Sequence, residues 1–370
     1  MVTTDVLIIG GGVQGLLTAR ALRLAGRKVV LLDRSRPGLG ASWAAAGMVT
    51  IPPPGADDDE ARLNRFSAGL FPALAATLKG ETGTDIEYVE DGWARLAWTA
   101  DEAATLANEH RVALGLGDPS EFLEGRAIRL REPLLSEGVV AARFHPGGQV
   151  ENRALVAAVE RAEVHGGTRI AGFESAREIV RKSGGTLYVI AERDRYEAPT
   201  VVLAAGAWAG EIKGCLPVVP VTPQRGQILD FETNLFPTRR AFLHVSDRPY
   251  LVPRSGGRVI AGATQEFVGF DEGPPTTAGM TWILEGVRAT VPSLESVALK
   301  SAWSGFRPMT PDRLPLIGPA AVRGLFYVTG HGRNGIGLAP GSAALVAAHI
   351  LGQPLPITST AFDPMRFGGA

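Results

Sequence analysis

The N-terminal stretch of residues 5–33, DVLIIGGGVQGLLTARALRLAGRKVVLLD, constrains the fold of this chain more than any other feature. Its apolar run Val6–Ile9 is typical of a parallel strand buried on both faces, and glycines at G-x-G-x-x-G spacing follow it directly. Apolar residues then recur at helical intervals up to Gly26, and a second apolar run, Val29–Leu32, ends in Asp33. The pattern predicts a complete strand, helix and strand unit of a parallel sheet.

The three glycines of this motif, Gly10, Gly12 and Gly15, predict a dinucleotide site. One permits the tight turn, one lets the backbone approach a pyrophosphate, and one lets helix and strand pack closely. The pyrophosphate would lie at the helix N-terminus, where free N–H groups and the dipole favour negative charge. Asp33, 18 residues beyond Gly15, is placed to accept hydrogen bonds from a ribose. FAD or NAD is favoured over NADP, since a carboxylate repels a 2′-phosphate. A glycine-rich turn in an ordinary α/β protein does not account for the flanking strands.

Composition excludes several function classes. At 370 residues, two or three domains are expected, and 45% hydrophobic content with 46 glycines fits a globular α/β protein. Lys plus Arg total 37 and Asp plus Glu 38, so nothing indicates binding to nucleic acid or to an anionic membrane. The single cysteine, Cys215, excludes an internal disulfide and is interpreted as a small buried hydrophobe rather than a nucleophile. Six scattered histidines argue against a metal site.

No targeting or membrane segment is expected. The N-terminal apolar run belongs to the first strand, and no apolar stretch reaches about 18 residues. The protein is therefore expected to be cytoplasmic. Residues 51–60, IPPPGADDDE, are predicted to form a solvated acidic loop stiffened by proline.

Periodicity predicts the later elements. Helices are expected at residues 57–79, 100–116 and 280–291, from a cap at Asn152 to about His165, and from about Leu338. Residues 84–98 are interpreted as short strands around Gly92, and further strands are expected near residues 187–192, 200–204 and 325–329. Four β-rich runs between residues 224 and 264 predict a mostly antiparallel sheet in a second domain.

With these stretches placed, the chain resembles the D-amino-acid oxidase superfamily of flavoproteins, and within it the glycine oxidase (ThiO-like) branch. The resemblance rests on motifs that occur in order along nearly the whole chain: GGGVQG at residues 10–15 with Asp33, ASWAAAGM at 41–48, VVLAAGAW at 201–208, YLVPR at 250–254 with AGAT at 261–264, FRPMTPD at 306–312 with IG at 317–318, and GHGRNG at 330–335. These motifs alternate between pieces of a dinucleotide domain and pieces of a sheet domain, as they do in that fold.

The resemblance implies an α/β fold with a Rossmann-type FAD-binding domain around a parallel sheet and a second, α+β substrate domain with a mostly antiparallel sheet. The FAD domain is expected to comprise residues 1–80, 150–215 and 300–370, and the substrate domain residues 81–149 and 216–299. The flavin would lie between them, bound noncovalently, since Cys215 lies outside the region where relatives attach it.

The implied activity is that of an FAD-dependent amine or amino-acid oxidase. Such enzymes pass a hydride from the carbon beside an amine to the flavin. The imine then hydrolyses to glyoxylate or another 2-oxo acid and an amine or ammonia, and dioxygen is reduced to hydrogen peroxide. The expected partners are a small amine or amino acid and dioxygen, without nucleic acid or membrane; a homo-oligomer is compatible with the sequence.

The resemblance also assigns site residues. Arg307 and Tyr250 match the residues that hold the substrate carboxylate, and Arg333 matches an arginine beside substrate and flavin. The alternatives are an Arg307–Asp312 surface ion pair, a tyrosine that only packs, and an arginine that stabilises its loop. No general base is required, because a neutral amine has its lone pair available, so His331 and His244 are unassigned. The expected cofactor contacts are Gly10, Gly12, Gly15, Asp33, Arg34, Ser42, Ala45, Ala46, Gly47, Met48, Ala205, Gly206, Trp208, Gly332, Arg333, Asn334, Gly335, Ile336, Gly337 and Leu338.

Two departures from the branch bear on the substrate. Gly332 and Gly337 stand where a bulky and an aliphatic residue are expected, so the pocket is predicted to admit an N-substituted glycine, unless these positions point away from the substrate. Residues 49–51 also depart from the usual pattern. Two rival functions remain open: a dehydrogenase of the same fold, acting on a D-amino acid or secondary amine with another electron acceptor, and a flavin-binding subunit without catalysis.

Overall fold

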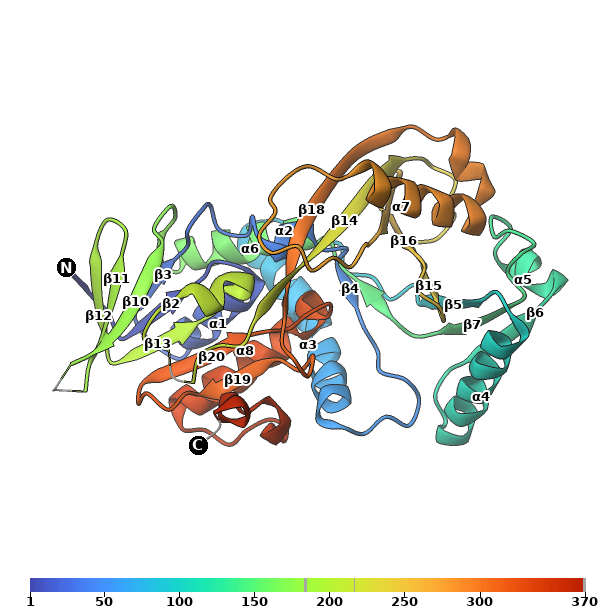
Figure 1. Cartoon of the computed structure of the whole chain (residues 1–370). Coiled ribbons are helices and arrows are strands. Elements are labelled where there is room, and N and C mark those ends of the chain that lie inside the picture. The colour runs from blue at the N-terminus through green and yellow to red at the C-terminus, as the bar shows by residue number, and fades with distance from the viewer. Residues whose placement is uncertain (183–184, 216, 369–370) are drawn as a thin grey trace.

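The computed structural model describes residues 1–182, 185–215 and 217–368. Its strands form three large sheets, of six, four and eight strands, and one two-stranded ribbon (Figure 1). The six-stranded sheet has the order β19-β20-β13-β2-β3-β9 and is parallel except for β19 at its edge. Its strands are β2 (Val6–Ile9), β3 (Val29–Leu32), β9 (Arg169–Ala171), β13 (Thr200–Leu203), β19 (Leu316–Pro319) and β20 (Leu325–Thr329).

The central strands of this sheet are buried on both faces, which explains their unbroken apolar sequences. In β2, Val6 and Ile8 pack toward helices, whereas Leu7 and Ile9 pack toward the four-stranded sheet. The helices are α1 (Val13–Leu24), α3 (Asp59–Thr82), α6 (Asn152–His165) and α8 (Gly335–Leu351). The four-stranded sheet contains β1 (Val2–Thr3), β10 (Ala176–Arg181), β11 (Leu187–Ala191) and β12 (Arg195–Ala198). The result is a three-layer arrangement around the predicted parallel sheet.

The eight-stranded sheet has the order β18-β14-β17-β16-β15-β5-β7-β6 and is antiparallel except between β15 and β5. Its strands are β5 (Trp93–Ala97), β6 (Glu121–Glu124), β7 (Ala141–His145), β14 (Thr222–Glu232), β15 (Ala241–His244), β16 (Tyr250–Arg254), β17 (Arg258–Gly262) and β18 (Leu299–Met309). The long strands β14 and β18 pair along their length and reach from the parallel sheet toward α7 (Thr277–Thr290) (Figure 1).

The shorter elements complete the chain. They are α2 (Ala41–Ala44), α4 (Ala100–Leu116), α5 (Arg126–Arg131), the β4 (Met48–Val49) and β8 (Gly148–Gln149) ribbon, and the 3₁₀ turns η1 (Gly206–Glu211), η2 (Pro292–Ser296), η3 (Thr360–Phe362) and η4 (Pro364–Phe367). The predicted division into two domains stays a prediction. Its boundary at residue 300 falls at the start of β18, a strand of the eight-stranded sheet.

Most predicted elements are present. The helix at 100–116 and the strand at 325–329 have the predicted bounds, whereas the last helix begins at Gly335 rather than Leu338. Three further expectations need correction. Residues 84–98 contain one strand, β5, and an isolated bridge at Val89. Asn152 is not a cap: Glu151 precedes the helix, and the Asn152 amide donates to the backbone carbonyls of Ser42 and Trp43.

The third correction concerns residues 51–60, because this acidic stretch is only partly solvated. Asp58 caps α3 by accepting the N–H of Ala61. The side chain of Asp59 is only 11% exposed, and it accepts the N–H of Ala361. These contacts anchor the end of the loop to α3 and to the C-terminal segment.

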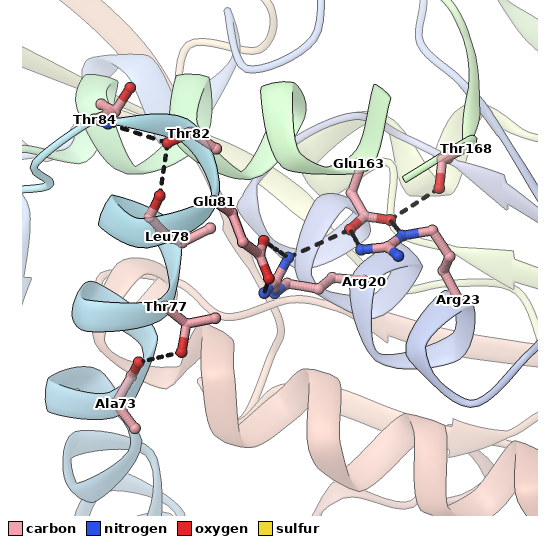
Figure 2. A network of polar contacts seen from close by, with 10 residues as sticks. All are labelled: Arg20, Arg23, Ala73, Thr77, Leu78, Glu81, Thr82, Thr84, Glu163 and Thr168. Carbon is pink, nitrogen blue, oxygen red and sulfur yellow. Dashed lines mark hydrogen bonds and ion pairs between the residues drawn. The ribbon is translucent and has the colours of Figure 1, made fainter. Parts of the chain in front are cut away.

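A largely buried ion-pair network ties α1, α3 and α6 together (Figure 2). The Glu163 carboxylate is completely buried; it accepts hydrogen bonds from Arg23 at 2.9 and 3.0 Å and from the Thr168 hydroxyl at 2.8 Å. Arg20 lies 3.7 Å from Glu163 and pairs with Glu81 of α3 at 2.7 Å. The network fixes the helix whose N-terminus carries the glycine motif.

Candidate active site

A cavity of about 910 Å³ lies between the parallel sheet and the eight-stranded sheet. At one end it is bounded by the residues that follow β2, β3 and β13, which is the carboxyl edge where open α/β sheets bind their ligands. At the other end it is bounded by residues of β14, β16 and β18. An elongated ligand can therefore extend from one sheet to the other.

The glycine motif forms a close backbone contact at the first end. Gly10 has φ +111°, and a Cβ atom on it would lie 2.3 Å from the Ala204 carbonyl oxygen. A Cβ atom on Gly15 would lie 1.9 Å from the Gly10 carbonyl oxygen, so Gly15 packs helix on strand and does not line the cavity. Gly10 and Gly12 line it, and the Ser42 hydroxyl accepts the N–H of Val13 at 3.0 Å. The first turn of α1 is thus held against the cavity wall.

Asp33 lies at the end of β3 on the cavity wall, as expected. Its carboxylate accepts the N–H of Gly11 at 2.7 Å and both the N–H and the hydroxyl of Ser35, at 2.8 and 3.0 Å. Burial raises the pKa of Asp33, and these hydrogen bonds oppose that shift. A carboxylate accepts about four hydrogen bonds, so the group keeps capacity for a ribose hydroxyl.

Gln14 links the first turn of α1 to the start of α8 beside the cavity. It is 9% exposed, lines the cavity, and donates from Nε2 to the Gly335 carbonyl at 2.8 Å. Its Oε1 atom is buried and has no partner in the described part of the chain. A flipped amide would place oxygen against oxygen at Gly335, so Nε2 is the atom that donates there. This hydrogen bond ties the N-terminus of α1 to the N-terminus of α8 beside the cavity.

Arg34 and Trp208 line the cavity beyond Asp33, as expected for cofactor contacts. The Arg34 guanidinium lies 3.7 Å from the Trp208 ring centroid and forms an ion pair with Glu272 at 2.7 Å. Trp208 also stacks on Phe270, at a centroid distance of 5.2 Å. The loop between β17 and α7 therefore closes over this end of the cavity.

At the other end, Arg307 and Tyr250 come from β18 and β16 and line the cavity. The Arg307 Nη1 atom donates to the Thr264 carbonyl at 3.0 Å and to Gln224 Oε1 at 3.4 Å. Tyr250 is opposite Gly262 in the β16–β17 register.

Two strand glycines create the space for these side chains. A Cβ atom on Gly226 would lie 2.6 Å from the Arg307 Nη atoms, and one on Gly262 would lie 3.3 Å from the Tyr250 hydroxyl. The guanidinium can lie over the sheet only because Gly226 has no side chain.

The charge of Arg307 is not neutralised by the protein. Burial lowers its pKa from the ordinary value, and no carboxylate oxygen within the described residues lies within 4.0 Å of it. The alternative of an ion pair with Asp312 is wrong, because Asp312 pairs with Arg366 at 2.7 Å. Burial raises the pKa of Tyr250, opposed by the nearby positive charges of Arg307, Arg254 and Arg333. The site is therefore prepared for an anionic group.

The N-terminus of α8 reaches the same region. Gly332, Arg333, Asn334, Gly335 and Ile336 line the cavity, and Gly332 has φ +52°.

The expectations for Gly337 and Leu338 need correction, because neither residue lines the cavity. A Cβ atom on Gly337 would meet the Met48 carbonyl oxygen and the Thr50 nitrogen at 3.2 Å, and Leu338 is fully buried in the helical core. Gly337 therefore allows α8 to pack on β4 and adds no room for substrate.

The remaining wall at this end is apolar. Met48, Trp93, Ile228 and Leu243 line the cavity and belong to one hydrophobic cluster. The other expected cofactor contacts Ser42, Ala45, Ala46, Gly47, Ala205 and Gly206 also line the cavity.

Sequence reasoning missed Gln14, Gln224, Gly226, Gly262 and Thr264. Isolated glycines inside β-rich runs signal a close approach, so Gly226 and Gly262 carried a readable signal. Gln224 and Thr264 carried none, because only the strand register brings them to Arg307.

The unassigned histidines form hydrogen bonds within the protein, and the cysteine is buried. The imidazole of His331 lines the cavity and shares a hydrogen bond with Ser342 at 3.0 Å, and burial lowers its pKa to about 3. His244 accepts from Trp98 at 2.9 Å. Cys215 is buried, as predicted, and burial raises its thiol pKa to about 11. Within the described ranges no group of metal-binding side chains occurs, and no helix there is long and apolar enough to cross a membrane.

Comparisons with known proteins agree with this geometry. A family model described as FAD dependent oxidoreductase (DAO) matches residues 5–349. The glycine oxidase of Geobacillus kaustophilus (strain HTA426) is 33% identical over 353 residues, covering 93% of this chain and 92% of that protein. The bifunctional protein ThiO/ThiG of Trichormus variabilis is 35% identical over 99% of this chain, which spans 55% of that protein's length.

Solved structures are similar over the whole chain. The crystal structure of glycine oxidase from Geobacillus kaustophilus has a TM-score of 0.93 and 31% identity, covering 100% of both chains. That of iminodiacetate oxidase from Chelativorans sp. BNC1 has a TM-score of 0.86 and 25% identity, covering 97% of this chain and 99% of the other.

Proposed function

The chain belongs to the DAO family of FAD-dependent oxidoreductases, and from that premise we propose that it oxidises the amine of glycine or of an N-substituted glycine. It is an FAD-dependent enzyme of the glycine oxidase type. The products are an imine, which water hydrolyses to glyoxylate and ammonia or an amine, and hydrogen peroxide. The observation that carries the proposal is the half-buried, unneutralised Arg307 beside Tyr250. A carboxylate on the substrate is the group that this pair would bind.

FAD, when bound, would supply the acceptor of the hydride, which carries both electrons of the oxidation. The residues of the chain would bind FAD and the substrate and orient them relative to each other. Gly10 and Gly12 would face the pyrophosphate, Asp33 the ribose, and residues 45–48 and 332–336 the ring. Arg307 and Tyr250 would fix the carboxylate, so that the carbon beside the amine faces the ring. No described carboxylate or histidine takes part as a base in this scheme.

The apolar wall supports a secondary amine as substrate. Met48, Trp93 and Leu243 offer contact surface but no charge to a substituent on the nitrogen. Gly332 remains part of this argument, since it lines the cavity, whereas Gly337 does not. The left-handed φ of Gly332 makes a tyrosine there strained, so the wall residues are the better positions to test. Iminodiacetate, after which the Chelativorans oxidase is named, is an N-substituted glycine of the same class.

The deciding experiment mixes the purified protein anaerobically with glycine, sarcosine, D-alanine and a long N-alkylglycine, and follows the loss of flavin absorbance. Reduction by glycine or an N-substituted glycine is expected. Bleaching by D-alanine alone would point to a D-amino-acid enzyme, and bleaching without oxygen uptake on aeration would favour the dehydrogenase. No bleaching by any amine would favour the subunit without catalysis.

The Arg307→Lys variant is the matched test of the carboxylate clamp. Lysine keeps the charge but loses the planar fork, and a hydrogen bond to a charged group contributes about 1.5–3 kcal/mol. We expect kcat/KM to fall by at least about tenfold, mainly through KM, while FAD stays bound. Unchanged kinetics would reject Arg307 as the clamp.

A further inference from the structure

Arg254 is a buried arginine beside the cavity that the proposed reaction leaves unused. It stands four residues after Tyr250 on β16, is 7% exposed, and is not itself part of the cavity wall. Its guanidinium donates to two backbone carbonyls from distant segments, those of Ala46 and Val150. The residue opposite it in the sheet, Arg258, pairs instead with Asp230 at 3.0 Å and with Glu151 at 3.6 Å.

The contact with Ala46 determines how the next peptide group is oriented. In a trans peptide the N–H points away from the preceding carbonyl. With the Ala46 carbonyl directed at the guanidinium, the N–H of Gly47 is turned to the other side, and Gly47 lines the cavity. No described residue accepts this N–H, whereas the Gly47 carbonyl accepts the N–H of Val150 at 2.9 Å.

Gly47 is the residue type that this arrangement requires. Its φ is +64°, and a Cβ atom there would lie 2.1 Å from the Val150 carbonyl oxygen and 2.6 Å from Arg254 Nη2. Any side chain at position 47 would displace the guanidinium from its two carbonyls. Arg254, Val150 and Gly47 therefore form one unit, although they are far apart in the sequence.

The charge of Arg254 is also uncompensated. No carboxylate oxygen of a described residue lies within 4.0 Å of it, and its Nε atom is buried without a partner. The charged groups that face it are Glu151, Glu87 and Arg258, with Tyr250 on its own strand. Burial lowers its pKa to about 10, so it remains protonated at neutral pH. An unpaired buried cation is costly, and negative charge gained in the neighbouring cavity would offset that cost.

We propose that Arg254 is a positioning residue for the flavin: by holding the Ala46 and Val150 carbonyls it fixes the Gly47 N–H as a hydrogen-bond donor to the ring, with a positive charge behind it. The inference rests on the proposed function for the position of the ring but not for the identity of the amine. Fixed donors of this kind favour the electron-rich form of a bound group, because they need no reorganisation when charge appears.

The test compares Arg254→Lys and Arg254→Met with the control Arg258→Lys. Lysine keeps the charge but cannot bind both carbonyls through a planar fork, and methionine keeps bulk without charge. FAD affinity is measured by fluorescence titration of the apoprotein, and the midpoint potential and visible spectrum are measured on each FAD-loaded variant. None of these readouts needs the amine, so a wrong substrate assignment leaves them interpretable.

We expect both Arg254 variants to bind FAD about tenfold more weakly or worse, with a more negative midpoint potential and a shifted visible spectrum. The potential of Arg254→Met should fall further than that of Arg254→Lys. Arg258→Lys should match the wild type within about twofold in affinity. An unchanged potential in Arg254→Lys, or equal effects in Arg254→Lys and Arg258→Lys, would overturn the proposal. If Arg254→Met does not fold, the potential of Arg254→Lys alone decides.

Discussion

At the scale of single residues, the site depends on glycines that leave space for other side chains. Gly226 and Gly262 lie on neighbouring strands, under the Arg307 guanidinium and the Tyr250 hydroxyl respectively. A β-strand with a side chain at either position would push the binding groups into the cavity. The proposed carboxylate clamp therefore depends as much on glycines that leave space as on the charged and polar side chains.

We predict that Gly226→Ala displaces the Arg307 guanidinium, since the new Cβ would lie 2.6 Å from its nitrogens. Misplacement of a binding group by about 1 Å can cost about 100-fold in rate, so steady-state kinetics should show a fall of that order in kcat/KM. Gly69→Ala in α3 is the control, because a Cβ there meets nothing within 4 Å. It should leave kcat/KM unchanged and raise stability by about 0.5–1 kcal/mol. Equal kinetics for the two variants would contradict the prediction.

Gln14 allows a second test at this scale. Gln14→Leu removes the hydrogen bond from Gln14 Nε2 to the Gly335 carbonyl, which ties α1 to α8 beside the cavity. A neutral hydrogen bond contributes about 0.5–1.5 kcal/mol, so FAD should bind roughly 3- to 10-fold more weakly in a fluorescence titration. Gln265→Leu, at an exposed position, should not change the affinity. The assignment fails if both variants bind FAD like the wild type.

At the scale of elements, α1 is held from behind by charge as well as by apolar packing. Arg20 and Arg23 of α1 reach Glu163 of α6, and Arg20 also reaches Glu81 of α3 (Figure 2). The hydrogen bond with Glu163 raises the pKa of Arg23. These contacts position the helix end that would bind the pyrophosphate.

We predict that Glu163→Gln lowers the free energy of unfolding by about 3 kcal/mol, because it leaves Arg23 without its buried carboxylate, whereas Arg20 keeps Glu81. Denaturant unfolding of the FAD-loaded protein measures this loss. The matched control is Glu295→Gln, whose ion pair with Arg288 is exposed at 65% and 64%; it should change stability by less than about 0.5 kcal/mol. A loss no larger than that of the control would show that the network is dispensable.

At the scale of the whole molecule, buried histidines predict sensitivity to acid. Burial lowers the pKa of His331 to about 3, and those of His145 and His244 to about 4. Since the ordinary value is 6.5, the unfolded chain binds more protons than the folded one between about pH 6.5 and these values. Stability should therefore fall as the pH is lowered through this window.

The His331→Gln variant isolates one part of this effect. Each such histidine contributes a slope of up to about 1.4 kcal/mol per pH unit. Unfolding free energies measured from pH 6 to pH 4.5 should depend less steeply on pH in the variant by about that amount. Parallel slopes would mean that His331 does not control the acid response.

The cavity is also a feature of the whole molecule, because the residues that line it come from segments spread along most of the chain. Residues near 10, 33, 45, 205, 226, 250, 307 and 333 meet there. We propose that the two predicted domains are real units that share this boundary, with β14 and β18 as the strands that extend toward it (Figure 1). The cytoplasmic location and a homo-oligomer stay predictions.

The sequence alone determined the features that depend on residues close together in the chain. The strand, helix and strand unit, its glycine motif and Asp33 are encoded within 29 residues, because hydrophobic period and backbone freedom are local properties. The motif resemblance carried Arg307 and Tyr250 to the candidate site and gave the family, the fold and FAD. The fold class followed from the same information, and so did the approximate bounds of the elements with a clear hydrophobic period.

Only the tertiary structure decided which distant groups touch. It turned Gly337 toward β4, gave Asn152 the carbonyls of α2 instead of its own helix end, and paired Asp312 with Arg366. It also brought Arg254 to Ala46 and Val150, across 208 and 104 residues of chain. Such contacts follow from strand register and from how helices and sheets pack, which no short window of sequence encodes. The family and the cofactor were thus readable in the motifs, whereas the contacts between distant groups around the cavity were set by packing.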